Sequence, residues 1–162
     1  MTSAPVIKNN EITLRPVTEA DDELLLRLYA STREVELAQV PWTHEQKDMF
    51  VRMQFAAQKQ HYGATHPNAV HEIICRNAEP VGRLYLSRKD EAFHILDITV
   101  LPERRNSGAG SVVLRKIMDE ARTAEKPVTI YVETFNPSQR LFQRLGFHVV
   151  SNEGVHSLFR FG

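Results

Sequence analysis

The sequence predicts a mixed α/β fold, and two observations lead to this prediction. Short runs of β-branched and aromatic residues follow one another in the middle of the 162-residue chain, and amphipathic helical repeats occur on both sides of them. No internal repeat, low-complexity tract or linker divides the chain. We therefore expect residues 1–162 to form a single domain, long enough to bury a core of its own.

The N-terminal third is predicted to contain one strand and two helices. Residues 11–17 alternate as a strand does, and Thr18 with Asp21 resembles a capping box that opens the first helix. Thr43 and Gln46 repeat this signal for the second helix. The apolar stripe by which the second helix is expected to pack consists of Met49, Phe50, Met53, Ala56 and Ala57.

Strands dominate the rest of the predicted order. The pattern predicts a meander of three strands separated by polar breaks, at residues 69–77, 81–88 and 91–101. A third helix is predicted from about Ser107, because apolar residues recur there at helical spacing with charged residues opposite them. The remaining expected elements are a strand at 128–133, a short helix at 136–145 and closing strands at 147–150 and 156–161.

The charge balance and the apolar runs exclude some classes of partner. Lys and Arg total 20, as do Asp and Glu, so no net field attracts the protein to nucleic acid or to an anionic membrane. No apolar run approaches the roughly 18 residues of a membrane span, and residues 1–10 lack the apolar middle of a signal peptide. The single Cys75 lies in an apolar run, which indicates a buried structural thiol. A cytoplasmic enzyme or binding module is expected.

An anion site is predicted at the start of the third helix. Arg105, Gly108 and Gly110 directly precede its apolar repeat, and a helix N-terminus offers unpaired N–H groups with a partial positive charge. Phosphate is the anion that such an end most often binds. Two common phosphate motifs fit poorly: a P-loop needs Lys after its second glycine, where Ser111 stands, and a dinucleotide fingerprint needs a third glycine, where Val113 stands.

The motif R-x-x-G-x-G at residues 105–110 and the segment NPSQRLFQRLGF at residues 136–147 resemble the GCN5-related N-acetyltransferase (GNAT) superfamily. The order of strands and helices agrees, and the resemblance covers nearly the whole chain. It implies a mostly antiparallel central sheet flanked by helices and splayed between its fourth and fifth strands. It also implies transfer of an acetyl group from acetyl-CoA to a primary amine. Asn106 departs from the glycine common in the family, which costs little if its backbone is left-handed.

The resemblance assigns residues to acetyl-CoA. Main-chain N–H groups of the loop would hold the diphosphate, and the missing side chains of Gly108 and Gly110 would let its oxygens approach. Main-chain groups of Ile98 and Val100 would pair with the pantetheine arm, and one such N–H would polarise the thioester carbonyl. The residues expected to bind acetyl-CoA are Ile98, Thr99, Val100, Arg105, Asn106, Ser107, Gly108, Ala109, Gly110, Ser111, Asn136 and Phe142.

His94 is the expected catalytic base, because acetyl transfer needs a neutral amine. An amine with a pKa of about 10.4 is unprotonated in only about one molecule in 2,500 at pH 7. The resembled family carries Glu or His at this position in several members, and an imidazole with a pKa near 6.5 suits the role. Glu133, at the end of its strand, is the reserve candidate. Asp97 is expected on the opposite side of the strand from His94 and in a structural role.

Phe142 stands where many members of the resembled family have the Tyr that protonates the departing thiolate. Phe cannot donate a proton, so water or another group such as Ser138 or Tyr131 would have to serve as the acid. This departure keeps a second hypothesis open, in which the protein binds acyl-CoA as a sensor without catalysis. A nucleotide-binding protein that uses the same loop is a third hypothesis.

The acceptor is not defined by the sequence. The resemblance places the first two helices and their connection over the acceptor, so Arg33, Trp42 and His44 are the expected lining residues. A small amine, an amino acid, an aminoglycoside-like molecule and a protein N-terminus all stay open. The histidines lack metal-ligand spacing, so no metal is expected. The oligomeric state also stays open, a homodimer included.

Overall fold

A computed structural model describes residues 11–134 and 136–162. Residues 1–10, where no signal peptide is predicted, lie outside the described residues. The strands are β1 (Ile12–Pro16), β2 (Val70–Arg76), β3 (Glu79–Arg88), β4 (Phe93–Val100), β5 (Val128–Glu133), β6 (His148–Asn152) and β7 (His156–Phe161). The helices are α1 (Asp22–Ser31), α2 (Glu34–Leu37), α3 (His44–Thr65), α4 (Ala109–Thr123) and α5 (Gln139–Arg144), with short 3-10 helices η1 (Glu19–Asp21) and η2 (Pro102–Arg104).

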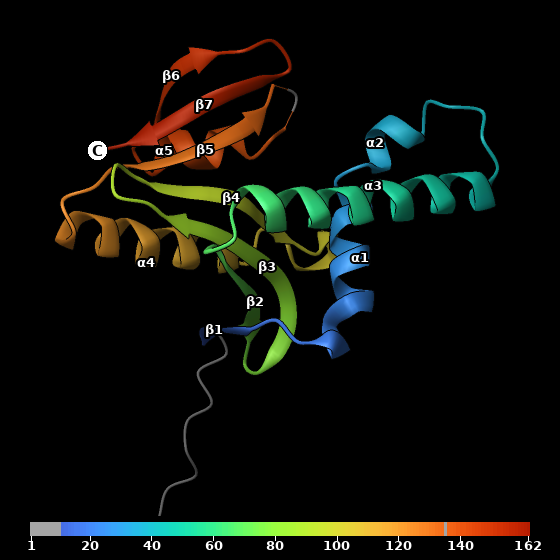
Figure 1. Ribbon diagram of the computed structural model, residues 1–162, viewed down its shortest axis with the longest axis horizontal. Helices are drawn as coiled ribbons and strands as arrows, with labels where there is room; N and C mark the ends of the chain where they lie inside the picture. The colour runs from blue at the N-terminus through green and yellow to red at the C-terminus, as the bar shows by residue number, and fades with distance from the viewer. Residues whose placement is uncertain (1–10, 135) are drawn as a thin grey trace, which may run out of the picture.

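One seven-stranded sheet runs through the structure in the order β1-β2-β3-β4-β5-β7-β6 (Figure 1). All neighbouring strands are antiparallel except β4 and β5, which are parallel. Within these two strands, pairing extends from Phe93–Val128 only as far as Ile95–Ile130. The remainder of β4 and of β5 is therefore splayed apart, which confirms the predicted mixed α/β fold and its split between the fourth and fifth strands.

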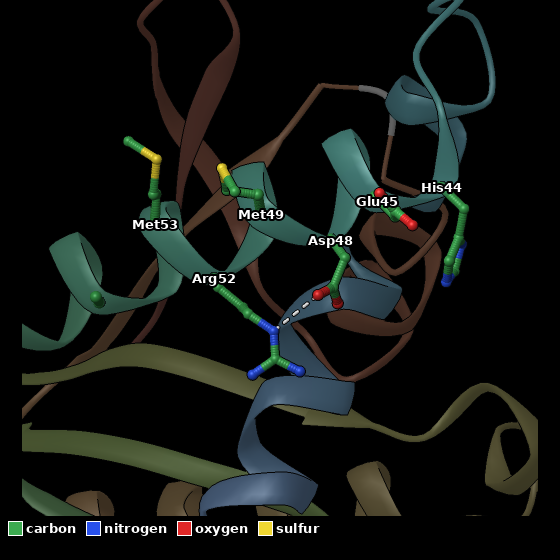
Figure 2. A pocket seen from close by; sticks show the side chains of 7 residues that line it. His44, Glu45, Asp48, Met49, Arg52 and Met53 are labelled. Atoms are coloured by element: carbon green, nitrogen blue, oxygen red, sulfur yellow. Dashed lines mark hydrogen bonds and ion pairs between the residues drawn. The ribbon is translucent and has the colours of Figure 1, made fainter.

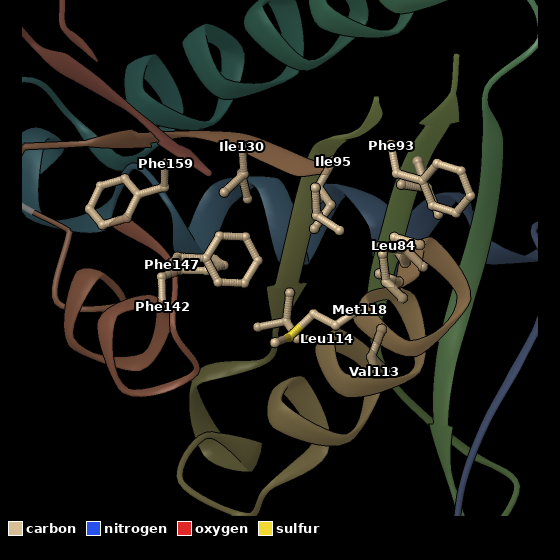
Figure 3. Packing of buried hydrophobic residues seen from close by; sticks show 14 of the residues in the cluster. Leu84, Phe93, Ile95, Val113, Leu114, Met118, Ile130, Phe142, Phe147 and Phe159 are labelled. Carbon is tan, nitrogen blue, oxygen red and sulfur yellow. The ribbon is translucent and has the colours of Figure 1, made fainter. Parts of the chain in front are cut away.

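The two faces of the sheet are covered by different helices. The larger core lies under α4 and α5, where Leu84 and Ile95 of the sheet meet Leu114 of α4 and Phe142 of α5 (Figure 3). A smaller core lies on the other face, where α1 contributes Leu28 and α3 contributes Phe55. Because α3 runs across the splayed strands, its inner face determines what surrounds the split (Figure 1).

Both predicted capping signals are present. The Thr18 N–H donates to Asp21 Oδ2 at 2.8 Å, and Arg15 donates two hydrogen bonds to the same carboxylate at 2.8 and 2.9 Å. The bond from Arg15 is the main reason that the pKa of Asp21 is lowered to about 2, which burial of the carboxylate opposes. At the start of α3 the Gln46 N–H donates to Thr43 Oγ1 at 3.1 Å, and the Thr43 N–H donates to Gln46 Oε1 at 2.9 Å.

The predicted packing face of α3 is wrong. Met49 and Met53 are each 66% exposed and lie on the side of the helix turned away from α1 (Figure 2). The residues that face the protein include Val51, which is buried, and Phe55, which packs against the smaller core. Both stripes are apolar enough for a surface helix, so periodicity alone does not decide which one the sheet covers.

Gly82 is required by the close approach of β3 to β4. A Cβ at this position would lie 2.4 Å from the Thr99 carbonyl oxygen, so the backbone would have to move. We expect Gly82→Ala to lower the free energy of unfolding by about 2 kcal/mol, as overpacking of a core does. Urea denaturation measures this loss. Gly63→Ala is the matched control, because a Cβ there meets nothing within 4 Å; an equal loss in both variants would contradict the steric explanation.

Candidate active site at the split between β4 and β5

A bulge in β4 determines which side chains face α3. Leu96 is an extra residue between Ile95 and Asp97, which both pair with β3. The extra residue reverses the alternation of the strand, so His94 and Asp97 lie on the same face. The prediction that Asp97 lies opposite His94 is therefore wrong. Its structural role is consistent with the geometry, because Asp97 Oδ2 accepts a hydrogen bond from the buried Arg83 at 2.5 Å.

His94 lies where the split begins. Its Nδ1 is 2.8 Å from Thr129 Oγ1 on β5, and its ring lies 6.4 Å from the His66 ring and 5.7 Å from the Tyr131 ring. Burial lowers the pKa of His94 below 6.5, and the nearby Lys89 and His66 lower it further. An imidazole whose pKa is lowered is neutral at pH 7, and only the neutral ring accepts a proton.

The loop before α4 has the backbone shape that the glycine-rich motif predicts. Asn106 has a φ of 61° and Gly108 has a φ of 87°, so both are left-handed. The first helical hydrogen bond runs from the Val112 N–H to the Gly108 carbonyl at 3.0 Å. The N–H groups of the three preceding residues are therefore left for a ligand at the helix N-terminus, as the anion-site prediction requires. They belong to Ala109, Gly110 and Ser111.

Side chains from inside and outside the motif hold this loop. Arg76 of β2 donates to the Ser107 carbonyl at 2.5 Å, and Ser107 Oγ donates to the Arg104 carbonyl at 2.5 Å. Arg105 Nε donates to the Val100 carbonyl at 3.3 Å. The Val100 carbonyl, expected to pair with pantetheine, thus already accepts a hydrogen bond. The predicted diphosphate contact of Arg105 stays a prediction.

Beyond Ile95, the edge of β4 that is not paired with β3 faces the split. The Leu101 N–H donates to the Val81 carbonyl of β3 at 2.8 Å. Main-chain groups of an antiparallel strand alternate in direction, so those of Val100 and Ile98 turn toward β5. Thr99 is instead buried, and its Oγ1 donates to Asp97 Oδ1 at 2.8 Å. The geometry agrees with the expectation for the Ile98 main chain and gives the Thr99 side chain a structural partner.

Glu133 and Arg33, predicted as reserve base and acceptor residue, lie close together. Arg33 Nη1 is 3.6 Å from Glu133 Oε1 and 3.2 Å from Glu36 Oε1. Glu133 is four residues beyond Thr129, the residue of β5 that pairs with His94. At about 3.3 Å per residue, Glu133 lies about 13 Å along the strand from His94. The two candidate bases thus occupy opposite ends of the split.

Trp42 and His44 are not brought to His94. His44 is the first residue of α3, whereas His66, at its C-terminal end, lies beside His94. A helix rises 1.5 Å per residue, which places His44 about 30 Å from this end. Figure 2 shows His44 on the same stretch of α3 as Met49, and Trp42 packs edge-on against Phe50 at 5.1 Å. The structure therefore does not bring either residue together with His94, and their acceptor role stays a prediction.

The two C-terminal candidates have structural contacts. Phe142 is 2% exposed and packs against Phe147 and Phe159, with ring centroids 5.4 and 6.0 Å away. Asn136 Oδ1 accepts a hydrogen bond from the Ser138 N–H at 2.9 Å, and α5 begins only at Gln139, two residues after Pro137, which was the expected first helical residue. Their contacts with acetyl-CoA stay predictions.

Three residues of α3 that the sequence reasoning missed contact β3 and β4 beside the split. Gln58 accepts a hydrogen bond from Arg83 at 2.8 Å, the Tyr62 hydroxyl donates to the Leu96 carbonyl at 3.2 Å, and His66 lies beside His94. They are spaced four residues apart and so form one stripe of the helix. The four-residue spacing of polar and aromatic side chains could have indicated this face of the helix. The stripe that contains Met49 and Met53 is more apolar, so hydrophobic periodicity favours it as the packing face instead.

His71 makes stability depend on pH. Its ring stacks on Tyr85 at 4.3 Å, and its Nε2 is buried with no hydrogen-bond partner among the described residues. Burial, followed by the charge of Arg83, lowers the pKa of His71 to about 4. A lowered histidine pKa stabilises the fold above the unfolded-state value near 6.5, and this contribution is lost as the pH falls toward 4.

We expect His71 to contribute about 2 kcal/mol to a loss of unfolding free energy between pH 7.5 and pH 5. Urea denaturation at the two pH values measures the loss. His71→Phe keeps an aromatic ring beside Tyr85 without a titrating group, so its stability should change less over this range. An equal pH dependence in the variant would show that other groups cause it.

The structure gives two further findings on the described residues. No group of three or more His, Cys, Asp or Glu side chains in residues 11–134 and 136–162 is arranged to hold a metal ion. No helix in this part of the chain is both long and apolar enough to cross a membrane.

A sheet splayed after a short parallel pair, with a glycine-containing helix N-terminus at the end of the split, is the architecture of the GNAT class of acetyltransferases. The chain belongs to the acetyltransferase (GNAT) family, whose sequence model matches residues 27–147. A comparison with curated protein sequences finds no match.

Solved structures with this fold include a PaiA N-acetyltransferase from Thermoplasma acidophilum in complex with coenzyme A, which is 15% identical over 93% of this chain and 98% of that one, with a TM-score of 0.70. An acetyltransferase from Thermus thermophilus is 20% identical over 93% and 96%, with a TM-score of 0.65. Naa50 from Arabidopsis thaliana, in complex with the bisubstrate analogue CoA-Ac-MVNAL, is 17% identical over 93% and 98%, with a TM-score of 0.59.

Proposed function

We propose that this protein transfers an acetyl group from acetyl-CoA to a primary amine by direct attack of the amine on the thioester. One observation carries the proposal: the split between β4 and β5 begins just after Ile95, one residue beyond His94, and opens toward the N-terminus of α4. A diphosphate bound at that N-terminus would lie at one end of the split, and the base would lie at the other.

The residues of the loop fit a diphosphate. The left-handed backbone at Asn106 and Gly108 turns the chain into α4. The N–H groups that precede the first helical hydrogen bond then have no partner within the helix. A Cβ at Gly110 would meet nothing within 4 Å, so there is open space at the helix end for phosphate oxygens. When bound, acetyl-CoA supplies an acetyl group activated as a thioester.

His94 would accept a proton from the acceptor's ammonium group, directly or through a water, and so leave the neutral amine to attack the thioester. Its lowered pKa keeps the ring neutral, and Thr129 fixes its Nδ1. Cys75 is 3% exposed in the smaller core, which supports direct transfer over a covalent acyl-cysteine. A buried, unreactive thiol also suits a reducing compartment such as the cytoplasm.

The leaving group would depart without a proton from Phe142. A thiol pKa near 8.5 makes the thiolate a tolerable leaving group in water near neutral pH. Besides water, the Tyr131 hydroxyl would be a source of a proton for the departing thiolate, since the exposed Tyr131 ring lies 5.7 Å from the His94 ring. Burial raises the pKa of Tyr131, so its hydroxyl is protonated at pH 7.

The acceptor we propose is a small-molecule or peptide amine. The Arabidopsis Naa50 structure holds an analogue that joins coenzyme A to a peptide, which supports a peptide as one candidate. Arg33 and Glu133 form a partly buried ion pair at the open end of the split, where an acceptor would enter. A homodimer is compatible with this arrangement, because the split lies within one chain.

Release of free thiol from acetyl-CoA, measured against a panel of amines and peptides, tests the proposal. Acceptor-dependent release supports an N-acetyltransferase. The second candidate is a non-catalytic acyl-CoA sensor, which is favoured by the absence of a hydroxyl at Phe142. Saturable acetyl-CoA binding without release for any acceptor would replace the first function by the second.

A further inference from the structure

The bulge of β4 coincides with the point at which β4 leaves β5. The last parallel pair joins Ile95 to Ile130, and Leu96 is the extra residue that follows. A bulge bends its strand and removes one residue from the hydrogen-bond ladder. From Asp97 to Val100, β4 is paired with β3 alone, and the unpaired bulge residue joins this stretch to the part that also pairs with β5. The position of this stretch relative to His94 therefore depends on what holds the bulge.

Tyr62 of α3 holds the bulge residue directly. Its hydroxyl donates a hydrogen bond to the Leu96 carbonyl at 3.2 Å. The ring stands edge-on against Tyr85 at 5.1 Å, and Tyr85 is stacked on His71. Burial, with the nearby charge of Asp97, raises the pKa of Tyr62, so the hydroxyl keeps its proton at neutral pH.

The residue after the bulge is held from the same helix through Arg83. Arg83 is 3% exposed, donates to Asp97 and to Gln58 Oε1, and lies over the Phe55 ring at 5.9 Å. Asp97 also accepts the hydroxyl of Thr99. Gln58 and Tyr62 are one turn apart on α3, so the helix fixes two successive residues of β4 at once.

We infer that Tyr62 is a positioning residue for acetyl transfer, which acts by fixing the main chain of Leu96 relative to His94. The inference rests on the proposed function. Residues Leu96 to Val100 connect the base to the helix end where the diphosphate would bind. A shift of the bulge would change the distance between the thioester and His94, and a misplacement of about 1 Å can reduce a rate about 100-fold.

Tyr62→Phe removes the hydroxyl and keeps the ring. We expect kcat to fall at least tenfold, while the Kd for coenzyme A and the KM for acetyl-CoA stay within about twofold. Hydrogen exchange of a peptide that covers Leu96 to Thr99 should become faster in the variant. Tyr85→Phe is the control, because its hydroxyl has no hydrogen bond among the described residues, and its kcat should stay within twofold of the wild type.

Two results would overturn the inference. If the wild type is active and Tyr62→Phe has the same kcat, the hydroxyl does not position the site, whatever the exchange rate. If the loss appears only as weaker coenzyme A binding, Tyr62 supports the cofactor site instead. A wild type that binds coenzyme A but releases none with any acceptor defeats the proposed function itself, and the positioning role fails with it.

Discussion

Gly110→Glu is expected to weaken acetyl-CoA binding at least 30-fold. The variant places a carboxylate in the first turn of α4, beside the N–H groups that would hold the diphosphate. Two like charges 4 Å apart repel by about 4 kcal/mol at an effective dielectric constant of 20. Even if salt halves this repulsion, about 2 kcal/mol remains, which corresponds to a factor of about 30.

The fold tolerates this substitution, so a loss of binding can be assigned to charge. A side chain at Gly110 meets nothing within 4 Å, and the same is true of Gly63 in α3. Gly63→Glu adds the same group to another helical glycine and is the matched control. Thermal stabilisation by acetyl-CoA, measured over a concentration series, gives the affinities. Unchanged affinity in a folded Gly110→Glu would remove the loop from the cofactor site.

His94→Ala is expected to lower kcat/KM 100-fold to 1,000-fold at neutral pH. General-base catalysis contributes about 100-fold to 10,000-fold in enzymes, and the unassisted amine is almost entirely protonated at pH 7. Binding of coenzyme A should be unchanged within twofold, because the side chain faces α3 and not the diphosphate loop. The assay is acceptor-dependent thiol release, with His148→Ala, an exposed histidine of β6, as the control.

The pH dependence of kcat/KM distinguishes a catalytic base at position 94 from a residue that only packs. Since burial lowers the pKa of His94, the ring takes up its proton at a pH below the ordinary histidine value of about 6.5. The wild-type profile of kcat/KM should therefore bend downward on the acid side of that value as the base becomes protonated. This bend should be absent in His94→Ala, whose kcat/KM should follow only the protonation of the amine. Parallel pH profiles for the two proteins would exclude His94 as the base and leave Glu133 as the candidate.

Local patterns predicted most of the elements that form the site. Capping boxes at Thr18 and Thr43 open η1 and α3, as expected, and Asn106 adopts the left-handed backbone that its place in the loop requires. These features depend on a few adjacent residues, so their chemistry can be read directly from the chain. The resemblance to GNAT proteins added the split between β4 and β5, which no local pattern indicates.

Features that depend on contacts between distant residues could not be predicted. The bulge at Leu96 places Asp97 on the same face as His94, and strict alternation gives the opposite result. The hydrogen bond from Tyr62 to Leu96 joins residues 34 positions apart. The length of α3 as one helix separates His44 from His94, although the helix as a whole was expected to lie over the acceptor.

The central claim is that the N-terminus of α4 and the split beside it bind the diphosphate and pantetheine of coenzyme A. Isothermal titration calorimetry of the folded protein with coenzyme A tests it most directly. We predict one saturable site per chain, which acetyl-CoA competes for and which Gly110→Glu weakens. A folded protein that gives no saturable heat with either ligand would contradict the account.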